Sequence, residues 1–70
     1  MLTETDTAIL VLESKFWRYQ GAKEEAIRSE LDLSPARYYQ RLLALMGDPE
    51  ALARAPVTVN RLRRLLVQYR

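Results

Sequence analysis

The residues with the clearest capacity for binding chemistry are the arginines in the second half of the chain. Residues 35–70 contain seven arginines, no lysine and two acids, a net charge of +5, whereas the seven acids and four bases of residues 1–34 give −3. Arginine can grip a phosphate group through two parallel N–H donors, which lysine cannot do. The basic half could therefore face a polyanion while the acidic half faces away. A solvated helix surface with no binding role explains the same distribution equally well.

Catalytic chemistry is not expected from this sequence. The chain has no histidine and no cysteine, which removes the commonest general base, the thiol nucleophile and the usual zinc ligands. Its clustered carboxylates have basic neighbours and are typical of surface charges and ion pairs: Glu24, Glu25, Glu30 and Asp32. No glycine-rich phosphate loop is present. We therefore predict neither an enzyme nor a bound cofactor or metal.

The length and composition predict one small folded domain over residues 1–70. A chain of 70 residues can build only a thin core. Its 49% hydrophobic and 29% charged residues are typical of a globular domain and not of a disordered segment. The apolar run over residues 8–12 is too short to span a bilayer and lacks the flanks of a signal peptide. We expect a cytoplasmic protein.

Apolar residues recur at helical spacing along the whole chain, and no stretch alternates in the manner of a strand. The first helix is expected to run to about Tyr19 and to be ended by Gly21. Three polar side chains near the start of the chain are candidates for its N-terminal cap: Thr3, Thr5 and Asp6.

Proline and glycine mark the later helices. Ser34 followed by Pro35 is a strong helix start, because a capping hydroxyl precedes a residue whose φ angle suits the first helical turn. The segment Gly47-Asp48-Pro49 repeats this stop and start. After the first helix, the expected helices cover residues 22–31, 35–46, 49–53 and about 58–70. The predicted fold class is all-α, a compact domain of four to five helices.

The two central helices and the turn between them have the outline of a helix-turn-helix over approximately residues 22–46. Asp32 occupies a turn position where glycine is usual, and aspartate tolerates the left-handed backbone better than most residues. Apolar residues recur where such a motif packs its helices together: Ile27, Leu31, Leu33, Tyr38 and Leu42. An ordinary helix-packing unit with a polar outer face would show the same pattern.

The free face of the helix over residues 35–46 would carry the side chains that read DNA. Arginine can bond guanine and glutamine can bond adenine through two contacts each, and these roles would fall to Arg37 and Gln40. Tyr39 could contact a phosphate or a thymine methyl group. The arginines expected to hold phosphates, which supply affinity but no sequence information, are Arg41, Arg61, Arg63 and Arg64. This interpretation is a transcriptional regulator or nucleoid-associated factor on double-stranded DNA.

Residues 24–43, and especially the run LSPARYYQRL over residues 33–42, resemble the helix-turn-helix of sigma-factor region four. More broadly, the chain is similar to a family of small uncharacterised actinobacterial helix-turn-helix-like proteins. That similarity lies in residues 16–27, 34–40, 49–52 and 61–65. It implies a helix-turn-helix fold and DNA binding.

Aromatic and apolar side chains leave a second class of function open. We predict Phe16, Trp17 and Tyr38 in the core, with Tyr19 and Tyr39 exposed. The apolar stripes of residues 9–17 and 59–69 exceed what one thin core can cover, which favours a homodimer through the terminal helices. The alternative function is a small protein-interaction module that docks on the transcription machinery or another regulator. Arginines gathered on one face would favour DNA, and dispersed arginines would favour the module.

Overall fold

The computed structural model describes the backbone of residues 1–68 and the side chains of residues 1–65. Within that part of the chain it contains five helices and no strand, which confirms the predicted all-α class. None of the described helices is long and apolar enough to cross a membrane. In chain order, the helices are α1 (Glu4–Ser14), α2 (Gln20–Leu31), α3 (Pro35–Met46), α4 (Pro49–Arg54) and α5 (Pro56–Gln68).

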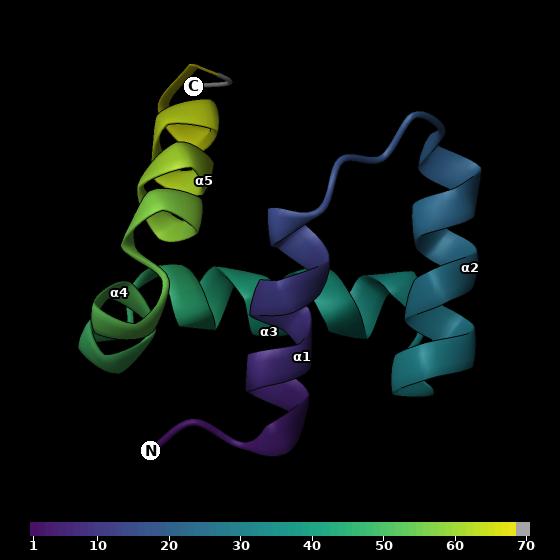
Figure 1. Cartoon of the computed structure of the whole chain (residues 1–70), viewed down its shortest axis with the longest axis horizontal. Coiled ribbons are helices and arrows are strands. Elements are labelled where there is room, and N and C mark those ends of the chain that lie inside the picture. Colours follow the sequence, from purple (N-terminus) through teal and green to yellow (C-terminus); the bar gives the residue numbers. More distant parts are fainter. Residues whose placement is uncertain (69–70) are drawn as a thin grey trace.

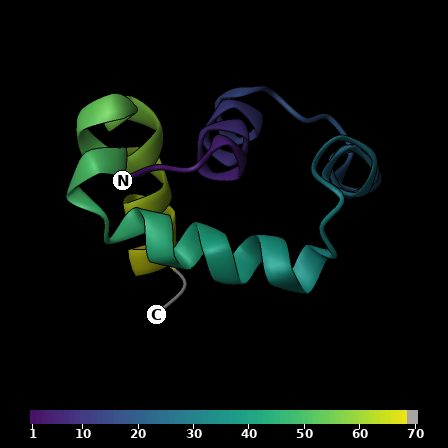
Figure 2. The same ribbon diagram turned by 90° about the horizontal axis from the view of Figure 1, so that it is seen from below.

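Helix α3 is the central element of the fold (Figure 1). It contacts each of the other four helices. Seen from below, α1 lies over the middle of α3, between α2 at one end and α4 with α5 at the other (Figure 2). The neighbours of α3 are thus gathered on one side of it, and its other side faces away from them.

The core is formed between the inner side of α3 and the helices packed on it. Tyr38 is fully buried at its centre and is the largest side chain so placed, as predicted. All five helices contribute to the buried apolar set: Ile9, Leu10, Leu12, Ala26, Ile27, Tyr38, Leu42, Leu45, Met46, Ala51 and Val59. The buried positions of α3 recur every three to four residues, so they occupy one face and leave the opposite face to solvent.

The turn from α2 into α3 forms as the sequence predicts. Asp32 adopts the left-handed conformation, with φ at 54°, and is the only described non-glycine residue to do so. Ser34 then caps α3, and its Oγ accepts a hydrogen bond from the Arg37 backbone N–H at 3.3 Å. Pro35 follows as the first helical residue. The observed bounds of α3 match the predicted ones because both of its ends are fixed by local signals.

The predicted end of the first helix is wrong. Helix α1 ends at Ser14, and Lys15 is already extended. The indole Nε1 of Trp17 folds back and donates to the Leu12 carbonyl at 2.9 Å. This carbonyl of the last helical turn also accepts from the Lys15 backbone N–H. Gly21 does not stop α1 but lies in the first turn of α2.

The aromatic pair in this connection divides between core and solvent. Trp17 is half-buried and packs against the core, as predicted in part. The prediction of Phe16 as a core residue is wrong, because its side chain is 89% exposed. The early end of α1 turns Phe16 away from the helical face that it would have shared with the core.

The two aromatic neighbours should therefore respond differently to alanine substitution. Trp17→Ala removes a partly buried ring and the hydrogen bond to Leu12, and it should lower the free energy of unfolding by about 2–3 kcal/mol, less than a fully buried aromatic would. Phe16→Ala should change it by less than about 0.5 kcal/mol. Urea titrations followed by circular dichroism compare the two variants. Equal losses would contradict the placement of these side chains.

Candidate nucleic-acid-binding site

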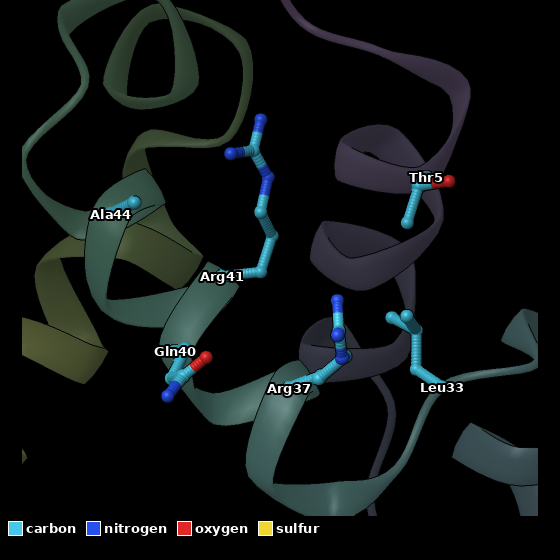
Figure 3. Close-up of a pocket in the computed structure, with 6 residues that line it drawn as sticks. All are labelled: Thr5, Leu33, Arg37, Gln40, Arg41 and Ala44. Carbon is cyan, nitrogen blue, oxygen red and sulfur yellow. The ribbon is translucent and has the colours of Figure 1, made fainter.

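A surface hollow lies between the outer flank of α3 and the first turn of α1 (Figure 3). Its volume is about 310 Å³. Most of its wall comes from α3, because residues three and four apart share one helix face. The lining residues are Thr5, Leu33, Arg37, Gln40, Arg41 and Ala44. The hollow therefore brings together three of the side chains predicted to contact DNA.

Arg37 and Gln40 are available for contacts at this hollow. Both are exposed. The Arg37 guanidinium and the Gln40 amide form no hydrogen bond or ion pair with the described part of the chain. In Figure 3 the Arg37 side chain extends from α3 toward the first turn of α1, where Thr5 lies, and Gln40 points away from Thr5. Two polar side chains on one flank of α3 are thus free to contact a ligand.

Arg41 is held in place by a buried acid. Its Nε donates to Asp6 Oδ1 at 2.6 Å and its Nη2 donates to Asp6 Oδ2 at 2.8 Å. Asp6 is 1% exposed, whereas the Arg41 side chain is half exposed. The sequence signalled both residues, Asp6 as a helix cap and Arg41 as a phosphate contact, but not their pairing.

Asp6 also completes the N-terminal cap of α1. The carboxylate accepts from the Thr3 backbone N–H at 3.1 Å, and the Thr3 hydroxyl accepts from the Asp6 N–H at 3.0 Å. This reciprocal arrangement is a capping box, and it identifies Thr3 as the cap among the three candidates. The hydrogen bonds from Arg41, and then those from Thr3, lower the pKa of Asp6 to about 2 against the opposing effect of its burial.

The arginines of α5 lie apart from this hollow. Arg61 donates through Nη2 to the backbone carbonyl of Glu13, and Arg63 donates through Nε to the Met46 carbonyl at 2.8 Å. Arg64 is exposed. Arg61 lines a second hollow that shares no lining residue with the first. The seven predicted contact residues therefore do not form one continuous face.

Tyr39 is less free than the sequence suggested. It is half-buried, and its hydroxyl accepts a hydrogen bond from Gln20 Nε2 at 2.9 Å. Its ring packs edge-on against Tyr38 with 5.2 Å between ring centroids. These contacts attach Tyr39 to α2 and to the core. Its predicted role in DNA contact remains a prediction.

Sequence reasoning missed one buried polar cluster, centred on Glu13. This side chain is 5% exposed, accepts a hydrogen bond from the Tyr38 hydroxyl, and pairs with Lys23 Nζ at 2.8 Å. Burial, followed by the Glu13 contact, raises the pKa of Tyr38 above its ordinary value. The spacing in the sequence could have revealed that Glu13 is buried. Glu13 follows Ile9 by four residues and so lies on the same, buried face of α1.

The apolar stripes expected to form a homodimer are largely used by the core. Ile9, Leu10, Leu12 and Val59 are all buried within the chain. Among the described residues, Val11 and Leu65 remain exposed in these stripes besides Phe16. The stripe residues Leu66 and Tyr69 lie outside the described side chains. Self-association remains a prediction, with a smaller apolar surface to support it than the sequence suggested.

The protein is thus a small all-α domain of five described helices, with a hollow lined by two arginines on the exposed flank of its central helix. The chain belongs to the family described as Protein of unknown function (DUF3263), whose model matches residues 1–68. No curated protein and no solved structure matches the chain. These comparisons give no support to the resemblance to sigma-factor region four or to helix-turn-helix proteins, which stays a prediction.

Proposed function

We propose that this protein binds double-stranded DNA through the exposed side of α3. The observation that carries the proposal is the pair of unengaged, exposed side chains, Arg37 and Gln40, on a flank of α3 that lies open to solvent beside the first turn of α1. An α-helix fits the major groove, where a glutamine can bond adenine through two contacts. Positive charge beside it supplies affinity for the backbone.

The connection between α2 and α3 supports this interpretation. Three residues separate the two helices, and the left-handed Asp32 provides the sharp change of direction. In a helix-turn-helix, the second helix enters the major groove and the first crosses the backbone. By that analogy α3 is the recognition helix, and the protein is a transcriptional regulator or nucleoid-associated factor that works in the cytoplasm.

A single domain of this size makes a small interface with DNA, so tight specific binding requires a second copy or a partner protein. The α5 arginines lie apart from the α3 hollow, and this dispersal is the observation that favours the protein-interaction module over DNA binding. Arg61 and Arg63 are bonded to backbone carbonyls of this chain. We therefore assign the DNA contact to α3 and not to α5.

Fluorescence anisotropy of a labelled random duplex, titrated with the protein at about 50 mM and about 200 mM salt, tests the proposal. The wild type should bind more tightly at the lower salt concentration. Gln40→Ala should weaken binding to a selected site by about five- to ten-fold and weaken binding to a scrambled site much less, because a base contact carries sequence information.

Arg54→Ala is the matched control for loss of charge. Arg54 is an exposed arginine on α4 that lines a different hollow, and its loss should leave DNA binding nearly unchanged. If the wild type binds no duplex even at the lower salt concentration, the DNA proposal fails and the protein-interaction module takes its place. If Arg54→Ala and Gln40→Ala weaken binding alike, α3 is not the contact helix.

A further inference from the structure

The hollow between α1 and α3 is lined by two guanidinium groups, of which one is hydrogen-bonded within the chain and the other is not. Arg41 is fixed by its two hydrogen bonds to the buried Asp6, whereas Arg37, one turn earlier on the same flank, is unengaged. A guanidinium has five N–H donors, so Arg41 keeps three after it has bonded Asp6. Figure 3 shows both side chains extending from the same side of α3.

The charge inside this hollow is not balanced. The Asp6 carboxylate neutralises one of the two guanidinium groups, so one positive charge remains. Asp48 is the other acid that acts on Arg41, and its carboxylate also accepts from the Glu50 N–H at the start of α4. The hollow is therefore suited to an anionic group.

The number and direction of the donors indicate which anion fits. The two oxygens of a carboxylate lie in one plane, whereas a phosphate group presents oxygens in several directions and so can accept from two separate guanidinium groups. Thr5 lines the α1 wall of the hollow, and in Figure 3 its hydroxyl points away from the two guanidinium groups. Because Asp6 already holds Arg41 in one orientation, less side-chain freedom is lost when an anion binds.

We propose that this hollow binds a phosphate group, with Arg37 and Arg41 as its cationic ligands and Thr5 on the opposite wall. The phosphate belongs either to the DNA backbone, in which case the inference rests on the proposed function, or to a free phosphorylated small molecule. In the first case, Arg37 contacts the backbone instead of a base, and Gln40 remains the base-reading side chain of α3.

Arginine Nε–H resonances of the full chain, followed by ¹H–¹⁵N NMR, test this site with sodium pyrophosphate as the probe. The Arg37 and Arg41 resonances should shift saturably, those of Arg28 and Arg54 should not, and sodium chloride at equal ionic strength should not reproduce the effect. Arg37→Ala should weaken pyrophosphate binding by about ten-fold. Thr5→Val, which removes a hydroxyl that points away from the two guanidinium groups, and Arg54→Ala should both leave it unchanged.

A parallel titration with duplex DNA distinguishes the sources of the phosphate. If the duplex shifts the Arg37 and Arg41 resonances, the phosphate is that of the DNA backbone, whether or not pyrophosphate also binds. Shifts with pyrophosphate from a chain that binds no duplex assign it to a free phosphorylated ligand and contradict the proposed function alone. Duplex binding that moves neither resonance overturns the phosphate site and leaves DNA binding intact. No saturable shift with either probe, or an equal loss in Arg54→Ala, also overturns the site.

Discussion

Tyr38→Ala is expected to unfold most of the protein. Tyr38 is fully buried on the helix that contacts all the others, so its removal leaves a cavity at the centre of a thin core. Loss of a buried aromatic side chain costs about 3–5 kcal/mol. A domain of this length has a total stability of about 4–10 kcal/mol. Circular dichroism should show a large loss of helix at room temperature or a much lower urea midpoint.

Tyr38→Phe separates the hydroxyl from the ring. It keeps the packing but removes the donor to Glu13, which is buried and would retain Lys23 as its one side-chain partner among the described residues. The free energy of unfolding should fall by about 1–3 kcal/mol. The matched control is Tyr39→Phe, because the hydroxyl of Tyr39 bonds Gln20 at the surface and its loss should cost less. Equal effects of the two variants would show that the contact between Tyr38 and Glu13 contributes nothing.

Asp6→Asn should cost about 2–3 kcal/mol at neutral pH and should flatten the dependence of stability on acid pH. The carboxyl has a pKa of about 2 in the folded protein against an ordinary value of 3.8, so the folded state favours the ionised form. That contribution is fully present above the unfolded pKa and is lost as the pH falls through about 2. The size follows from 1.4 kcal/mol for each tenfold difference in proton affinity, about 2–3 kcal/mol in all.

Urea titrations at several pH values between about 2 and 7 provide this measurement. The difference in stability between the wild type and Asp6→Asn should shrink as the solution becomes more acidic. Glu4→Gln is the control, because Glu4 is an exposed acid in the same helical turn. A difference that stays constant with pH would show that Asp6 acts through its shape and caps alone, without a charge effect.

The parts of the fold that the sequence predicts well are those set by short-range signals. Ser34 with Pro35 and Gly47 with Pro49 delimit α3 because caps and proline act on the adjacent turn. The end of α1 was missed because no such signal stands at Ser14. The backbone departs from the helix there, where the Trp17 indole bonds a carbonyl of the last turn, and spacing alone does not reveal a side chain that folds back.

The candidate site was predictable in its residue types but not in its pairings. Arg37 and Gln40 could be placed on the outer flank because Tyr38 and Leu42 identify the inner one. The pairing of Arg41 with Asp6 joins positions 35 residues apart in the chain, and no local pattern encodes it. The buried ion pair between Glu13 and Lys23 was missed for the same reason, since it depends on how α1 and α2 meet over α3.

The position of α3 also bears on how related chains can diverge. Its inner side chains are held by four helices, so a substitution there disturbs the whole structure. Arg37 and Gln40 on its outer side are exposed, so substitutions at these two positions cost the fold little. Members of the family can thus acquire a different ligand through a few changes on one helix flank while they inherit the same scaffold. In this architecture, selection for a new target and selection for foldability act on separate faces of one helix.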